Sequence, residues 1–278
     1  MKTILVTGAS GSLGRAAVSA LSAKGFSVRA ASRNPQYLAG SGVETVHFDY
    51  SDRASHQAAL EGVEGILLIA PPLDVEAHVK LIPFIDQAKA SGVEHMVLNS
   101  ALGVDANEAA PLRKIERHLA TSVAGYTILR PNFFMENFTT GFLAPMVRQG
   151  AIYLAAGDGK TSFISVRDIA AVAAAAFAGG HQGKEYNLTG PEALDHYEVV
   201  RLLSQASGRE IAYHAISEEE MIQGALQNGL SRSSAEFMAM LYSVVRNGWA
   251  AGVTSDVQQV TGQAPQSFAE FVRQSADA

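Results

Sequence analysis

A doubly wound parallel α/β sheet, followed by a smaller and mostly helical C-terminal lobe, is the fold that this sequence predicts. Short apolar runs alternate with helical patterns as far as Arg130, and the connections between them are short. A glycine-rich turn follows the first apolar run. Such alternation is typical of parallel sheets with right-handed crossovers. The alternation loosens past Phe138, so we divide the chain into a domain over residues 1–138 and a lobe over residues 139–278. This division leaves open whether a segment of the lobe returns to the sheet.

The composition is that of an ordinary globular protein. The 278 residues are 47% hydrophobic and 17% charged, enough for a large core. A net charge of −6 without any block of Lys or Arg argues against a nucleic-acid partner. The absence of cysteine excludes disulfides, thiolate metal sites and cysteine nucleophiles, and we expect no metal. No apolar run has the length of a signal peptide or a membrane span, so we expect a cytoplasmic protein with no membrane partner.

Six strands are predicted from the apolar runs. The first is a bare apolar run, as expected for a central strand that is covered on both faces. The predicted strands are residues 4–6, 26–31, 43–48, 65–69, 93–98 and 126–130.

Helical spacing predicts the crossovers and most of the lobe. In the first domain the predicted helices are residues 15–24, 54–60, 74–90 and 111–121. The third of these has its apolar face at Val75, Val79, Ile82, Ile85 and Ala88. In the lobe we predict helices at residues 142–148, 166–177, 196–206, 218–226 and 233–245, with short strands at 185–188 and 211–214.

The glycine-rich turn has the spacing G-x-x-G-x-x-G between a strand and a helix. Gly8 lets the chain leave the strand in a tight turn, Gly11 lets the backbone approach a pyrophosphate, and Gly14 lets the helix pack against the sheet. Free N–H groups and the dipole at the helix start would then hold the pyrophosphate. Because the strand–turn–helix context is present, the turn predicts a dinucleotide site.

The end of the second strand indicates which dinucleotide is bound. NAD sites place a carboxylate there for the ribose hydroxyls, whereas this chain has Ser32, Arg33 and Asn34. A guanidinium binds a 2′-phosphate through paired hydrogen bonds, so Arg33 predicts NADP(H). The alternative is a solvated arginine at a strand end.

Two further strand ends border the predicted ligand crevice. Asp49 and Tyr50 follow the third strand and border the adenine, unless they only form a turn with a helix cap at Ser51 or Asp52. The fourth strand ends in Ala70 and two consecutive prolines. Prolines stop both strand and helix, and they form a stiff wall that suits a loop passing close to the nicotinamide ribose.

Several segments resemble the NmrA-like atypical short-chain dehydrogenases. The nearest branch is that of the NADPH-dependent quinone oxidoreductases and triphenylmethane-dye reductases. The resemblance covers nearly the whole chain. It is carried by residues 7–14, 32–34, 115–119 and 127–137, and continues through 157–160, 167–170 and 186–190 to the tail around residue 262.

This resemblance implies a Rossmann-type NADP(H) domain with Arg33 on the 2′-phosphate. It also implies contacts of the cofactor with the turn from Gly8 to Leu13, with the proline pair and with the segment after the sixth strand. Together with the residues at the other strand ends, the remaining predicted cofactor-binding residues are Gly8, Ser10, Gly11, Ser12, Leu13, Asp49, Tyr50, Ala70, Pro71, Pro72, Ser100, Asn132 and Phe133. The resemblance further implies that a small aromatic or quinone-like substrate faces Phe133, Phe134, Met135 and Phe138. Core packing is the alternative for each of these phenylalanines.

One departure from ordinary short-chain dehydrogenases bears on the chemistry. Those enzymes use a tyrosine and a lysine four residues later, but here the residue four before Lys114 is Ala110. Lys114 and Ser100 are the two candidate catalytic groups, and the alternatives are a solvated lysine and a serine that caps a loop.

Reduction of a quinone or conjugated dye does not require that tyrosine. The charge left by hydride transfer is delocalised over an extended π system that water can protonate, whereas a simple ketone would leave an alkoxide that needs a donor. We therefore predict an NADPH-dependent reductase of quinone-like or dye-like acceptors. The alternatives are an NADP(H)-sensing regulator without turnover, and a reductase or isomerase of another small carbonyl compound. A homodimer is the oligomer we expect.

Overall fold

The structure is a computed structural model that describes residues 2–38, 42–123 and 125–276. The chain forms two compact units, and each is treated by itself. Unit 1 comprises Met1–Pro131, Val166–Asn187 and Gln259–Gly262, and unit 2 comprises Asn132–Ser165, Leu188–Gln258 and Gln263–Ala278. The chain therefore returns to unit 1 beyond the boundary at residue 138 that the sequence suggested.

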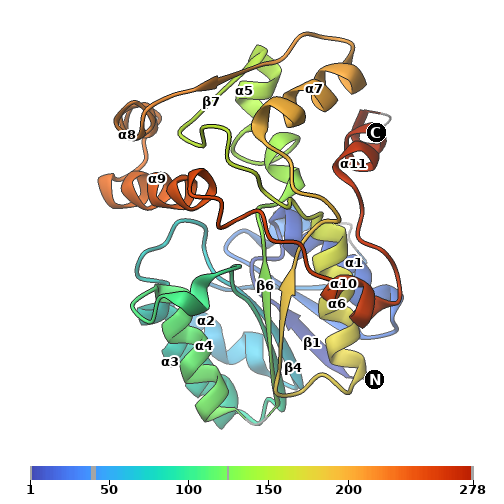
Figure 1. Cartoon of the computed structure of the whole chain (residues 1–278). Coiled ribbons are helices and arrows are strands. Elements are labelled where there is room, and N and C mark those ends of the chain that lie inside the picture. The colour runs from blue at the N-terminus through green and yellow to red at the C-terminus, as the bar shows by residue number, and fades with distance from the viewer. Residues whose placement is uncertain (1, 39–41, 124, 277–278) are drawn as a thin grey trace. The chain divides into compact units, whose positions relative to one another are not determined.

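Unit 1 is built on a seven-stranded sheet of order β3-β2-β1-β4-β5-β6-β8. Three of its strands, β1, β4 and β6, are labelled in Figure 1. The strands are β1 (Thr3–Val6), β2 (Ser27–Ser32), β3 (Glu44–His47), β4 (Gly65–Ile69), β5 (His95–Asn99), β6 (Gly125–Pro131) and β8 (Lys184–Leu188). The pairs among β1 to β6 are all parallel. The order 3-2-1-4-5-6 is that of a Rossmann fold, so the predicted fold class is confirmed.

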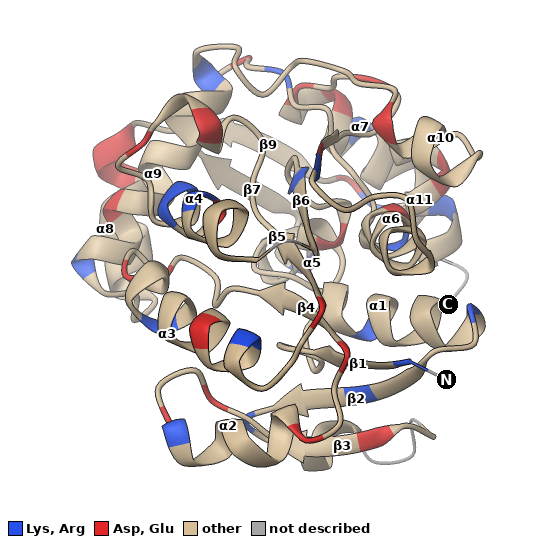
Figure 2. Cartoon of the chain, turned by 90° about the horizontal axis from the view of Figure 1, so that it is seen from below, with Lys and Arg blue, Asp and Glu red and all other residues tan. Residues whose placement is uncertain are grey.

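The first strand is central, as its apolar run predicts. β1 pairs with β2 on one side and with β4 on the other. Ile4, Leu5 and Val6 are at most 1% exposed. Helices cover both faces of the sheet (Figure 2): α1 (Ser12–Ala23) packs with α6 (Val166–Ala178) on one face, and α3 (Ala77–Ala90) packs with α4 (Pro111–Ser122) on the other. The remaining crossover helix is α2 (Arg53–Leu60).

The strand predicted at residues 185–188 forms, but it is not part of a separate lobe. As β8, it extends the main sheet beside β6. Four polar or charged residues precede Leu188, as is usual in an edge strand.

The buried face of α3 agrees only in part with the predicted one: Ile85 and Ala88 are buried as predicted. Val79 is 60% exposed and Val75 precedes the helix, whereas Leu81 and Phe84 are fully buried. The helix turns its largest apolar side chain inward, where Phe84 packs edge-on against Phe48 with the ring centroids 4.9 Å apart.

Unit 2 combines helices with a small parallel sheet of β7 (Ala151–Leu154) and β9 (Ala212–Ala215). The helices are α5 (Ala144–Gln149), α7 (His196–Ser207), α8 (Glu218–Gln227), α9 (Arg232–Arg246) and α11 (Phe268–Ala276); α10 (Asp256–Thr261) contains residues of both units. Short 3₁₀ helices are η1 (Pro35–Leu38), η2 (Val104–Ala106) and η3 (Met135–Phe138). Capping boxes start α7 and α8, at Asp195 with Glu198 and at Ser217 with Glu220.

An aromatic cluster forms the centre of unit 2. The ring of Phe138 lies 5.3 Å from that of Phe163 and 5.4 Å from that of Phe268, both edge-on. Within the described ranges, no helix combines the length and hydrophobicity needed to cross a lipid bilayer.

Candidate functional site

The glycine-rich turn connects β1 to α1. Gly8 has a φ of 61°, in the left-handed region, so the tight turn predicted there is present. A Cβ on Gly14 would lie 2.2 Å from the carbonyl oxygen of Gly8 and 2.6 Å from the Cα of Ala9. Gly14 therefore lets α1 pack closely against the backbone that follows β1, because a side chain there would overlap Gly8 and Ala9. A Cβ on Gly11 would meet only the Gly8 oxygen, at 3.4 Å, so the role of Gly11 toward a pyrophosphate stays a prediction.

The start of α1 is suited to an anion. Its N-cap is Gly11, which has no side chain to bond the first helical N–H groups, and no acidic residue lies in the first turn. The helix has 12 residues, so a partial positive charge is expected at this end. An N-terminus of this kind matches the predicted pyrophosphate site.

The end of β2 is fixed to the glycine-rich turn. The Ser32 hydroxyl donates to the Ser10 hydroxyl at 3.1 Å, and the backbone N–H of Asn34 donates to Ser32 Oγ at 3.2 Å. Arg33 lies between these two residues with an exposed side chain. Within the described part of the chain its guanidinium has no hydrogen bond or ion pair. It therefore remains available for the 2′-phosphate that the sequence predicts.

The residues after β3 form a turn and a helix cap. The Asp49 carboxylate accepts from the Ser51 N–H at 2.8 Å, and Asp52 is the N-cap of α2. The Tyr50 hydroxyl donates to Thr7 Oγ1 at 2.9 Å, and burial raises the pKa of this phenol. The turn and the helix cap, which the sequence offered as an alternative, are therefore present. The contact of Asp49 and Tyr50 with the adenine stays a prediction.

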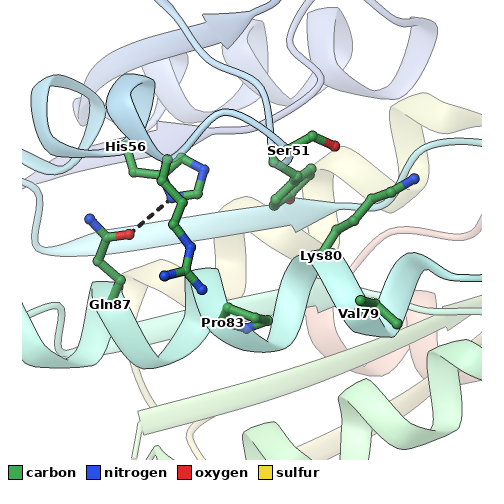
Figure 3. Close-up of a pocket in the computed structure, with 8 residues that line it drawn as sticks. Ser51, His56, Val79, Lys80, Pro83 and Gln87 are labelled. Carbon is green, nitrogen blue, oxygen red and sulfur yellow. Dashed lines mark hydrogen bonds between the residues drawn. The ribbon is translucent and has the colours of Figure 1, made fainter.

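A cavity of about 270 Å³ lies between α2 and α3 (Figure 3). At its base the His56 ring bonds Gln87 Oε1 through Nδ1 at 2.9 Å and the Asp49 carbonyl through Nε2 at 3.0 Å. Lys80, at its rim, is paired with Asp74 at 2.5 Å. Of the predicted cofactor-binding residues the cavity includes only Tyr50, so it is distinct from the predicted dinucleotide groove.

The proline pair after β4 leads into a strained residue. Pro71 and Pro72 are exposed and Ala70 is half-buried. Leu73 has a φ of 55°, which is uncommon for a leucine, and such strain often accompanies functional loops. The sequence carries no signal for it.

Ser100 directly follows β5 and faces a buried carboxylate. Its hydroxyl donates to Glu116 Oε1 at 2.6 Å, and the Glu116 side chain is fully buried. Arg130 donates to both oxygens of the same carboxylate at 2.8 Å, and Arg113 donates at 2.9 Å. Burial acts to raise the pKa of Glu116, yet the hydrogen bonds from Arg130, Ser100 and Arg113 hold it below its usual range. An ionised carboxylate only accepts hydrogen bonds, so the single hydroxyl proton of Ser100 is committed to Glu116.

The second candidate catalytic group has no such partner. Lys114 lies on the exposed face of α4. No hydrogen bond or ion pair of its ammonium group occurs among the described residues. Its surroundings are those of a solvated lysine.

Asn132 is a structural residue of unit 2. Its amide group donates to Ser162 Oγ at 2.7 Å and to the Ala250 carbonyl at 2.8 Å, and its amide oxygen accepts from the Phe133 N–H at 3.0 Å. The side chain is 5% exposed. Any contact between Asn132 and the cofactor stays a prediction.

The four predicted substrate residues differ in burial. Met135 and Phe138 are each 1% exposed and belong to the core of unit 2. For Phe138 the structure therefore shows core packing, which was the alternative to a substrate contact. Phe133 and Phe134 are half-buried, and the Phe133 ring lies 5.7 Å from that of Tyr242. Phe133 and Phe134 are therefore the two with surface for a ligand.

The structure adds two residues of unit 1, Glu116 and Arg15, that the sequence did not indicate as site residues. Glu116 lay in a segment that resembled the family, but its burial and its bond to Ser100 have no sequence signal. Arg15 follows Gly14 directly, and its Nε donates to the Ser10 carbonyl at 3.0 Å. Its position directly after the glycine-rich turn is the sequence feature that could have indicated a role at the dinucleotide site.

Comparison with known proteins finds relatives that match nearly the whole chain. An NAD(P)H azoreductase of Xenophilus azovorans is 33% identical over 284 residues, which cover 99% of this chain and 98% of that protein. The NADPH-dependent quinone oxidoreductase of Escherichia coli, solved with NADPH, has a TM-score of 0.83 at 29% identity and covers 98% of this chain and 99% of its own. The triphenylmethane reductase of Citrobacter sp., solved with NADP(H), has a TM-score of 0.81 at 28% identity, with 98% and 99% covered.

The family assignment follows from a match over most of the chain. The model of the NmrA-like family matches residues 1–248 of the 278. The match includes the glycine-rich turn, the Ser100–Glu116 pair and the segment from Asn132 to Phe138. The chain therefore belongs to the NmrA-like family.

Proposed function

We propose that this protein is an NADPH-dependent reductase that transfers a hydride to a quinone-like or conjugated dye-like acceptor. The relatives that support this proposal are named for the reduction of azo compounds, quinones and triphenylmethane dyes, and two of them were solved with the same class of cofactor. Reduction of conjugated acceptors is the chemistry that these three names share.

The residues of unit 1 fit a phosphorylated dinucleotide. The turn from Gly8 to Leu13 offers backbone N–H groups at a helix start without a side-chain cap, which suits a pyrophosphate. Arg33, exposed at the end of β2, suits a 2′-phosphate. Pro71 and Pro72 remain the proposed neighbours of the nicotinamide. When bound, the cofactor supplies the hydride.

The bond from Ser100 to Glu116 is the observation that carries the choice of acceptor. The Ser100 hydroxyl donates its proton to a buried carboxylate, with the two oxygens 2.6 Å apart, so it is not a proton donor for a substrate. Lys114 is exposed on α4, and no tyrosine occupies the position four residues before it. An acceptor whose negative charge is delocalised fits these residues, whereas a simple ketone does not.

The proposed acceptor contacts are Phe133 and Phe134. Both are half-buried in unit 2, and Phe133 packs beside Tyr242, so each ring keeps apolar area that a planar acceptor could cover. The task of such residues is orientation of the acceptor, which alone is worth orders of magnitude in rate.

The test is to follow NADPH oxidation with a panel of quinones, azo dyes, triphenylmethane dyes and enones, with simple ketones as the matched control. We expect turnover with conjugated acceptors and little with ketones. Turnover of ketones at the rate of quinones would contradict the argument from Ser100. Tight NADPH binding without oxidation by any acceptor would instead favour a cofactor-sensing regulator.

A further inference from the structure

The guanidinium of Arg15 is held at the mouth of the glycine-rich turn by neutral groups. Its Nε donates to the carbonyl of Ser10 at 3.0 Å, and its Nη2 donates to the carbonyl of Tyr37 at 3.1 Å. Ser10 belongs to the turn and Tyr37 to η1, so Arg15 bridges the two segments that flank Arg33. The side chain is nevertheless exposed to solvent.

Arg15 has no acidic partner within the described ranges. By contrast, Arg29 pairs with Glu44 at 2.7 Å and Arg130 pairs with Glu116 at 2.8 Å. A guanidinium has five N–H donors, and two of those of Arg15 are used on carbonyls, which leaves three N–H groups and a full positive charge. The two carbonyl bonds fix the orientation of the guanidinium in advance, so a ligand would lose less side-chain entropy on binding it.

The position of Arg15 is tied to that of Arg33. Ser10, whose carbonyl holds Arg15, also accepts a hydrogen bond from the hydroxyl of Ser32 at 3.1 Å. Ser32 directly precedes Arg33. Two arginines that lack acidic partners among the described residues are therefore linked through the Ser10–Ser32 hydrogen bond, Arg15 by its bond to the Ser10 carbonyl and Arg33 as the residue after Ser32. Both lie next to the turn that is proposed to hold the pyrophosphate.

We propose that Arg15 is a second ligand of the 2′-phosphate of NADP(H) and acts together with Arg33. The inference rests on the proposed function and adds a specificity residue to it. A monoester phosphate carries close to two negative charges near neutral pH and three acceptor oxygens, which matches two guanidinium groups better than one. The competing role for Arg15 is that of a strut that only holds η1 against the turn.

Binding calorimetry with NADPH, NADH and adenosine 2′,5′-bisphosphate separates these roles. We expect Arg15→Met to weaken NADPH and the bisphosphate by about tenfold, with NADH nearly unchanged, because only the first two carry the 2′-phosphate. The NADPH affinity of Arg15→Lys should fall between those of the parent and of Arg15→Met, since lysine keeps the positive charge but cannot donate the paired hydrogen bonds of a planar guanidinium. In the double variant with Arg33→Met, the affinities for NADPH and NADH should become nearly equal.

Lys24→Met is the matched control, because it removes one positive charge from the other end of the same helix. It should leave the ratio of NADPH to NADH affinity unchanged. If Arg15→Met weakens NADPH and NADH equally, or lowers the midpoint of thermal unfolding without changing their ratio, Arg15 is a strut and the inference is wrong. A parent protein that binds neither dinucleotide would instead overturn the proposed function itself.

Discussion

Replacement of Glu116 by glutamine tests how much the buried cluster stabilises unit 1. The Glu116 carboxylate is fully buried and accepts four hydrogen bonds, from Ser100, Arg113 and twice from Arg130. Glutamine has nearly the same volume but turns an NH₂ group toward a guanidinium and removes the buried negative charge between Arg113 and Arg130. The acidic partners that remain to these two arginines, Glu108, Asp105 and Glu185, are all at least 40% exposed. Removing one partner of a buried pair costs about 3–5 kcal/mol, so we expect the free energy of unfolding of Glu116→Gln to fall by about that amount.

The assay is urea denaturation, and Glu108→Gln is the matched control. Glu108 also contacts two arginines, Arg113 at 3.0 Å and Arg117 at 2.8 Å, but its side chain is 61% exposed. Solvent screens such a pair, so its loss should change stability far less. Equal losses in the two variants would refute the reasoning, because burial is the main difference between the two carboxylates.

The same cluster has a predicted pH dependence. The folded pKa of Glu116 lies below its ordinary value, so its contribution to stability is complete above that value and is lost as the pH falls through the folded pKa. The Glu116→Gln variant has no such group and should show a shallower acid limb in a plot of stability against pH.

Three further predictions concern the cofactor, the chemistry and a buried histidine. Arg33→Ala should weaken NADPH about ten- to a hundredfold with little effect on NADH, as measured by calorimetry; equal weakening would contradict the 2′-phosphate assignment. In steady-state kinetics with a good quinone, Ser100→Ala and Lys114→Ala should stay within about tenfold of the parent, whereas Phe133→Ala should lose on the order of a hundredfold; a collapse in Lys114→Ala at unchanged NADPH affinity would restore a catalytic lysine. Burial lowers the pKa of His196 from 6.5 to about 4, so the unfolded chain takes up the proton first and stability should fall by about 3 kcal/mol as the pH drops from 6.5 through 4. His196→Phe should remove that loss, and an unchanged acid limb in this variant would show that the histidine is not its cause.

The fold was predictable because its signals are local. The apolar run of β1 and the glycine at Gly8 each depend on a few neighbouring residues, and the backbone geometry they require does not change with the rest of the chain. The absence of an acid beside Arg33 is likewise visible in the sequence. These features were sufficient to predict the sheet, the turn and the type of dinucleotide.

Some elements were placed incorrectly because periodicity leaves alternatives that only packing resolves. Val79 and Leu81 are both apolar residues of α3, but the helix buries Leu81 because that rotation also buries Phe84 against Phe48. The strand at residues 185–188 was recognised, but its neighbour in the sheet was not, because pairing with β6 joins segments more than fifty residues apart.

The site depends on tertiary structure in the same way. Ser100 reads as a serine at a strand end, and its proton is committed only because the fold brings the buried Glu116 within 2.6 Å of it. Phe133 and Phe138 are the same residue type five positions apart, yet one keeps partial exposure and the other is 1% exposed. The sequence by itself determined which chemical groups the protein has and the local backbone that carries them. The tertiary structure decided which of those groups are buried, and burial fixes their hydrogen-bond partners and so the chemistry left to them.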